Sequence, residues 1–165
     1  MSERVMHILF LCTGNSARSI MAEVLLNRLG GARCTASSAG SHPKGAVHPL
    51  ALATLKSMGL PVDGLRSKSW EEFARSDAPP LDMIVTVCDA AAGEVCPLWP
   101  GQPITAHWGV EDPAAFQGAE DAQRAKFHEV ALILRRRIER FLRLPLATLD
   151  RTTRQARLQE IGQEA

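Results

Sequence analysis

Two adjoining stretches decide the fold of this chain: the apolar run Val5-Met6-His7-Ile8-Leu9-Phe10-Leu11 and, directly after it, Cys12-Thr13-Gly14-Asn15-Ser16-Ala17-Arg18-Ser19. The first is typical of a buried strand, and a helical spacing of apolar residues follows from Ala17 to Leu29. A strand that turns through small residues into a helix gathers backbone N–H groups and the positive end of the helix around one point. This context predicts a loop that binds an oxyanion.

Cys12 and Arg18 stand at the two ends of this loop. The Arg18 guanidinium can hold two oxygens of a bound anion in a fork. The same positive field favours the thiolate of Cys12, which is the nucleophilic form. A buried, inert cysteine is the commoner role for this residue type, but the strand–loop–helix setting favours catalysis. We therefore predict that Cys12 is the nucleophile and that the anion is bound by Thr13, Gly14, Asn15, Ser16, Ala17, Arg18 and Ser19.

Length and composition indicate one domain with a real core. The chain has 165 residues, of which 45% are hydrophobic and 22% charged. A formal net charge of +1 predicts no affinity for nucleic acid or for an anionic membrane. No apolar run approaches the ~20 residues of a membrane-spanning helix, and a signal-peptide pattern is missing, so we expect a cytoplasmic protein. In that reducing compartment the four cysteines are expected to be catalytic or redox-active.

Strand-like and helix-like patterns alternate along the chain. We expect strands at 5–11, 33–39, 82–87 and 104–108, and helices at 17–29, 48–59, 69–73 and 127–142. This alternation predicts a single three-layer α/β domain with a mainly parallel sheet over 5–144. Residues 145–165 are expected to form a C-terminal helical extension, with Asp150 capping a helix that lies in solvent. A partner-docking segment is the alternative for this extension.

Three reactive groups follow strands of this expected sheet. Cys12, Cys88 and Asp112 come after the strands at 5–11, 82–87 and 104–108. Ligands bind at the carboxyl ends of parallel strands, so these groups are expected at one pocket. Asp112 would act there as general acid, protonating a leaving oxygen. An aspartate before a proline also commonly caps a turn, and both roles are compatible.

Cys88 and Cys96 carry a second signal, because seven residues rich in alanine separate them. A straight helix would hold the two sulfurs too far apart for a disulfide, so pairing would require the segment to loop out. Two unrelated cysteines, or half of a metal site, are the alternatives. Metal ligands usually come in closer pairs, so we predict no metal. Cys34, inside an expected strand, is interpreted as a core residue.

Four separate motifs resemble the arsenate reductases built on the low-molecular-weight tyrosine phosphatase fold. The motifs are Cys-Thr-Gly-Asn-Ser-x-Arg-Ser at 12–19, Thr86-Val87-Cys88, Cys96-Pro97 and His107-Trp108-Gly109-Val110-Glu111-Asp112-Pro113. They occur in the family's order over about 5–144. The resemblance implies a four-stranded parallel sheet with helices on both sides, which agrees with the pattern of strands and helices.

The resemblance also implies a thiol–disulfide relay. Cys12 would attack arsenate held by the loop and Arg18, while Asp112 protonates the departing hydroxide. Cys88 would then attack Cys12, releasing arsenite, and Cys96 would attack Cys88 to leave a Cys88–Cys96 disulfide. No bound cofactor is implied. The electrons would come from thioredoxin, or from a glutaredoxin–glutathione or mycothiol system.

The sequence departs from this family at three positions. Ala17 stands where relatives often have cysteine, which leaves the relay intact. Thioredoxin-linked relatives generally have one residue fewer between the last two cysteines, so the reductant stays open. Some relatives bind potassium through residues that match Asn15, Glu23 and Ser38 and through an aspartate, where this chain has Lys68. The Lys68 ammonium is expected to replace that ion.

Two other functions remain open at this point. A low-molecular-weight protein tyrosine phosphatase would need only Cys12, Arg18 and Asp112, and would pass through a phosphocysteine. Against this, the chain has no tyrosine to flank an aryl substrate, and Cys88 and Cys96 would have no task. A non-catalytic arsenic or oxyanion sensor would use the cysteines as soft ligands.

Overall fold

The computed structural model describes residues 5–88, 99 and 103–163. The elements follow one another as β1 (Met6–Leu11), α1 (Arg18–Gly30), β2 (Cys34–Ala39), α2 (Pro49–Ser57), α3 (Glu71–Ala74), β3 (Met83–Thr86), β4 (Ile104–His107), the 3-10 turn η1 (Pro113–Ala115), α5 (Glu120–Arg143), the 3-10 turn η2 (Leu146–Thr148) and α6 (Arg151–Gln163). The expected strands and helices are all present. The largest difference is α5, which begins seven residues earlier than the apolar stripe that predicts it.

The four strands form one parallel sheet in the order β2-β1-β3-β4. The central strand β1 is buried on both faces, because successive side chains of a strand point to opposite sides. Ile8 and Phe10 join the core on one face, and Leu9 and Leu11 join the core on the other. The predicted four-stranded parallel sheet is therefore confirmed.

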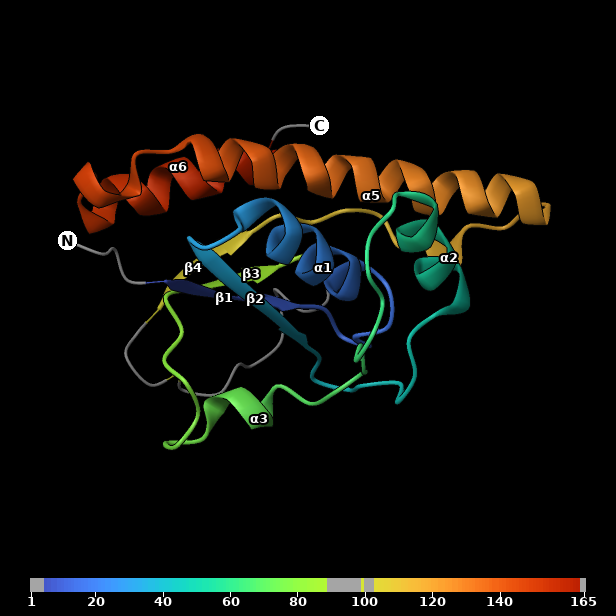
Figure 1. Ribbon diagram of the computed structural model, residues 1–165, viewed down its shortest axis with the longest axis horizontal. Helices are drawn as coiled ribbons and strands as arrows, with labels where there is room; N and C mark the ends of the chain where they lie inside the picture. Colours follow the sequence, from blue (N-terminus) through green and yellow to red (C-terminus); the bar gives the residue numbers. More distant parts are fainter. Residues whose placement is uncertain (1–4, 89–98, 100–102, 164–165) are drawn as a thin grey trace.

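Helices cover both faces of this sheet, as Figure 1 shows. The larger core lies under α1, α2 and α5, with Trp108 and the buried stripe of α5 at its centre. The smaller core lies on the side of α3, where Trp70, Phe73 and Trp99 pack on it. Cys34 is buried in the larger core, as expected. No helix of the described residues is long and apolar enough to cross a membrane.

The C-terminal helix α6 is present, and its expected cap is formed, since the Thr153 N–H donates to Asp150 Oδ1 at 2.7 Å. Most of its residues lie at the surface, as expected, but the helix is docked on the domain and is not surrounded by solvent. Leu158 and Ile161 are buried, and α6 packs along the edge strand β4 (Figure 1). Side-chain amides add to this docking, since Gln159 Oε1 accepts the His107 N–H and the Gln155 amide donates to the Thr105 carbonyl.

Candidate active site

The loop at residues 12–17, between β1 and α1, is held from outside through its carbonyl groups. A trans peptide points its N–H away from its C=O, so carbonyls bound outside turn the N–H groups of Gly14, Asn15 and Ala17 inward. This is the geometry of an anion-binding cradle. The hydrogen bonds run from His42 N to Thr13 O at 2.9 Å, from Lys44 N to Gly14 O at 2.9 Å, from Ser67 Oγ to Gly14 O at 3.2 Å, and from His48 N to Ser16 O at 2.8 Å.

Asn15 fixes the inner turn of the loop. Its φ of 44° lies in the left-handed region, which asparagine tolerates better than most residues. The side chain is fully buried, and its amide donates to Ser19 Oγ at 2.7 Å. Its carbonyl oxygen accepts the Lys68 backbone N–H at 2.9 Å. Ser19, expected to bind the anion, therefore has its hydroxyl engaged in holding Asn15.

Gly40 lets the end of β2 approach the loop. A Cβ at this position would lie 2.4 Å from the carbonyl oxygen of Thr13 and 2.6 Å from that of Cys12. Both contacts are with backbone, which cannot turn aside as a flexible side chain would. Any larger residue would therefore push the loop away from the segment that orients its carbonyls.

The Cys12 and Cys88 side chains are hydrogen-bonded to each other at the mouth of the loop, and both are buried. The Thr13 N–H also donates to Cys88 Sγ at 3.4 Å. The hydrogen bond that the Cys12 thiol donates to Cys88 and the burial raise the pKa of Cys12, while Arg18 and the Gly14 amide act in the lowering direction. Arg18 and the loop amide thus favour the Cys12 thiolate, as expected, but in this arrangement the hydrogen bond to Cys88 and the burial outweigh them.

Arg18 and Asp112 are brought together next to the loop. Arg18 Nη1 donates to the Val110 carbonyl at 3.1 Å, and Nη2 lies 3.8 Å from Asp112 Oδ2. The other carboxylate oxygen, Oδ1, accepts the Ala114 N–H at 3.0 Å and so caps η1. The capping contact is present, and it leaves Oδ2 directed toward the arginine.

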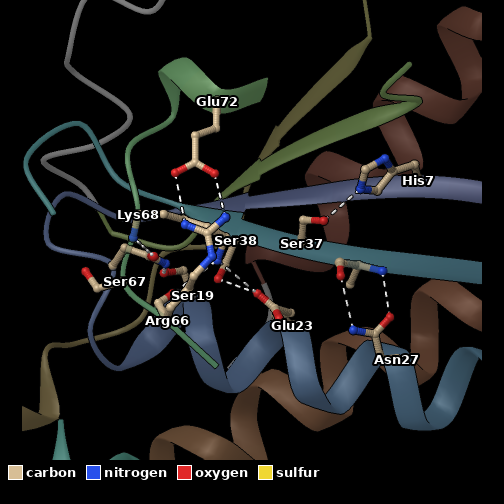
Figure 2. A network of polar contacts seen from close by, with 12 residues as sticks. His7, Ser19, Glu23, Asn27, Ser37, Ser38, Arg66, Ser67, Lys68 and Glu72 are labelled. Atoms are coloured by element: carbon tan, nitrogen blue, oxygen red, sulfur yellow. Dashed lines mark hydrogen bonds and ion pairs between the residues drawn. The ribbon is translucent and has the colours of Figure 1, made fainter. Parts of the chain in front are cut away.

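Behind the loop a polar network joins α1, β2 and the segment before α3 (Figure 2). Ser38 Oγ donates to Glu23 Oε1 at 2.6 Å, and Lys68 Nζ lies 3.7 Å from the same oxygen. Burial lowers the pKa of Lys68, and the Glu23 carboxylate acts against this shift. Among the described residues no group of three or more His, Cys, Asp or Glu side chains could hold a metal ion.

Of the residues predicted for catalysis, Cys12, Arg18, Cys88 and Asp112 come together from three strand ends. Cys96 and the segment between the two cysteines lie outside the described residues. Sequence reasoning missed the supporting segment at 42–48 and the hydroxyl of Ser67. The one available signal was Gly40, a glycine directly after a strand, which commonly marks a close approach of backbone.

These features are the ones expected of a phosphatase-like site. The chain belongs to the low molecular weight phosphotyrosine protein phosphatase family, whose model matches residues 7–155. It is 36% identical to an arsenate reductase of Halalkalibacterium halodurans over 134 residues, which cover 81% of this chain and 93% of the relative.

Solved structures agree with these relatives. An arsenate reductase in a phosphate-binding state superposes with a TM-score of 0.67 at 28% identity, covering 84% of this chain and 97% of the other. A thioredoxin-dependent arsenate reductase of Corynebacterium glutamicum superposes with a TM-score of 0.56 at 25% identity, covering 84% of this chain and 64% of the other.

Replacing Gly40 by alanine tests the scaffold of the loop. The added methyl meets two carbonyl oxygens of the loop, so G40A is expected to weaken binding of inorganic phosphate by at least about tenfold, measured by calorimetric titration. The matched control is G118A, whose added methyl meets side chains only. Equal phosphate affinity in G40A and the parent protein would contradict the scaffold described here.

Removing the Cys88 sulfur tests the coupling of the two thiols. Because the Cys88 hydrogen bond is the largest cause that raises the pKa of Cys12, C88A is expected to lower that pKa. The thiolate fraction at neutral pH then rises, and iodoacetamide alkylates Cys12 faster. The rate is followed from pH 5 to 10 by peptide mass spectrometry. An unchanged or higher midpoint in C88A would show that Cys88 does not hold the Cys12 proton.

Proposed function

We propose that this protein reduces arsenate to arsenite through an intramolecular thiol–disulfide relay, in the detoxification of arsenic. One observation carries the proposal: a second buried thiol, Cys88, is hydrogen-bonded to the nucleophile Cys12 at the oxyanion loop. Hydrolysis of a phosphate ester has no use for that second thiol. The arsenate reductases among the relatives support the same function.

In the first step the Cys12 thiolate attacks arsenate held by the inward N–H groups and Arg18. An S–As bond forms, an As–O bond breaks, and Asp112 gives its proton to the departing hydroxide, which leaves as water. Cys88 and the anion compete for the Thr13 N–H, so the anion enters as the Cys88 sulfur withdraws. That withdrawal also removes the main cause of the raised Cys12 pKa.

In the second step the Cys88 thiolate attacks the Cys12 sulfur. The electron pair of the S–As bond passes to arsenic, which is reduced from As(V) to As(III) and leaves as arsenite. A Cys12–Cys88 disulfide remains. Cys96 then attacks Cys88 and frees the Cys12 thiolate, leaving a Cys88–Cys96 disulfide for an external thiol to reduce.

The electron donor in this proposal is an external dithiol, and no bound cofactor takes part. Thioredoxin is the first candidate, because a thioredoxin-dependent arsenate reductase is among the similar structures. A glutaredoxin–glutathione or mycothiol system is the alternative, given the spacing of Cys88 and Cys96. Such donors work in a reducing compartment, in keeping with the expected cytoplasmic location.

We further propose that the Lys68 ammonium supplies the positive charge behind the loop, so that no metal is needed there. It lies within ion-pair distance of Glu23, and its own backbone N–H holds Asn15. This contact ties the charge to the residue that fixes the inner turn.

Phosphatase activity is the second candidate, because the family model is that of a phosphotyrosine phosphatase. Cys12, Arg18 and Asp112 alone would carry it. Weak hydrolysis of p-nitrophenyl phosphate is compatible with arsenate reduction as a side reaction. Fast hydrolysis without any arsenite formation would reject the proposed function.

Substitutions of Cys12 and Cys88 separate arsenate reduction from phosphate-ester hydrolysis. Reduction is measured as arsenate-dependent NADPH oxidation in reconstituted thioredoxin and glutaredoxin systems, and hydrolysis with p-nitrophenyl phosphate. C12S is expected to abolish both reduction and hydrolysis. C88S is expected to abolish reduction and to retain p-nitrophenyl phosphate hydrolysis, since hydrolysis through a phosphocysteine needs no second thiol. C34A, in the core, is the matched control. Reduction by C88S at the parental rate would refute the relay.

A further inference from the structure

Arg137 is a charged residue in an apolar setting, on the inward face of α5. Only 7% of it is exposed, although most arginines of this helix lie at the surface. Its Nη1 donates to the carbonyl of Trp108 at 2.8 Å and to that of Gly109 at 3.0 Å. Burying a guanidinium is costly unless its donors are used, and here they are used on two backbone carbonyls. The position of these carbonyls indicates what Arg137 does.

The two carbonyls belong to the segment that leads from β4 to Asp112. The next carbonyl along, that of Val110, accepts from Arg18, and the Val110 N–H donates to Val87 O at 3.1 Å. Three consecutive carbonyls, 108–110, are thus held by two guanidinium groups. One of these groups also faces the Asp112 carboxylate in the site.

The same segment is fixed from the other side by α6. The Trp108 indole N–H donates to the Leu158 carbonyl at 2.8 Å, and the His107 N–H donates to Gln159 Oε1 at 3.0 Å. Gly162 packs so closely that a Cβ there would lie 2.0 Å from the His107 carbonyl oxygen. The indole also packs against Phe10 and Phe141. The start of the segment therefore has little freedom to rotate.

From this geometry we infer that Arg137 is a positioning residue for the general acid, and that α6 supports it. This role rests on the proposed reduction of arsenate. Arg137 itself contacts neither the substrate nor a reacting sulfur. Arg137 orients the peptides at 108–109, these orient the Val110 carbonyl, and that carbonyl fixes Arg18 against Asp112. A general acid is effective only within hydrogen-bond reach of the leaving oxygen, so this orientation controls proton transfer.

The expected consequence is a loss of turnover without a matching loss of anion binding. In R137M two carbonyls lose their donor, so the segment shifts and Asp112 no longer reaches the departing oxygen. The kcat for arsenate reduction is expected to fall at least about tenfold, because general acid catalysis contributes ~10²–10⁴-fold in rate. Binding of inorganic phosphate, to which the loop amides contribute as well as Arg18, is expected to fall by a clearly smaller factor than kcat. R137K keeps a charged nitrogen that can donate to the carbonyls, so it recovers part of the rate.

The test is a double-substitution cycle with D112N. R137M and R137K are each made in the parent and in D112N, with R136M as the matched control, since Arg136 is the exposed neighbour on the same helix. If Arg137 acts through Asp112, R137M lowers kcat in the parent and has no further effect in D112N. A purely structural role lowers kcat by the same factor in both backgrounds, and that result would overturn the inference.

Two further measurements distinguish failure of the variant to fold, failure of the positioning role of Arg137 and failure of the proposed function. If R137M does not fold at the assay temperature, R137K and G162A carry the same cycle, since the latter displaces α6 from His107. Parental kcat in both of these folded variants would overturn the inference. A parent protein that binds phosphate but forms no arsenite would instead reject the proposed function, whatever the variants do.

Discussion

The structure depends on hydrogen bonds that reach the loop at 12–17 from outside. Backbone N–H groups of residues 42–48 and the Ser67 hydroxyl bind carbonyls of the loop, and this turns the loop's own N–H groups inward. A buried carbonyl without a donor costs about 1–3 kcal/mol, so the outward orientation is strongly preferred. Gly40 lets the end of β2 come close to the loop. The Asn15 side-chain amide holds the inner turn of the loop through Ser19 and the Lys68 backbone. The anion site is thus a consequence of how β2 and the segment after it pack.

The same loop contacts the Cys88 sulfur and, in the proposed function, the oxyanion. Cys88 accepts the Thr13 N–H while it is bonded to Cys12, and the bond between the two thiols raises the pKa of Cys12. An oxyanion that displaces the second sulfur would release the first for attack. Activation of the nucleophile and entry of the substrate are then one event, and the second thiol stays close enough to react with the first once arsenic is attached. Arg137 and α6 hold the segment that leads from β4 to Asp112 through hydrogen bonds to residues 107–109.

The fold could be predicted from the sequence because local periodicity controls it. The alternation of Ile8 and Phe10 with Leu9 and Leu11 marks a strand buried on both faces, and the strand ends bring Cys12, Cys88 and Asp112 to one edge. The docking of α6 could not be predicted, since it depends on side-chain amides that meet the backbone of an edge strand. The raised pKa of Cys12 could not be predicted either, because it follows from a contact with a thiol 76 residues away in the sequence. A protein's tertiary contacts decide such electrostatic balances.

The central claim is that inward N–H groups of one loop bind a tetrahedral oxyanion. Titration of ¹⁵N-labelled protein with inorganic phosphate, followed by amide and arginine side-chain NMR, tests it directly. The account predicts that the N–H signals of Gly14, Asn15 and Ala17 and the guanidinium signal of Arg18 shift together and saturate with one dissociation constant. Shifts spread over surface lysines and arginines, with these four signals unmoved, would contradict it.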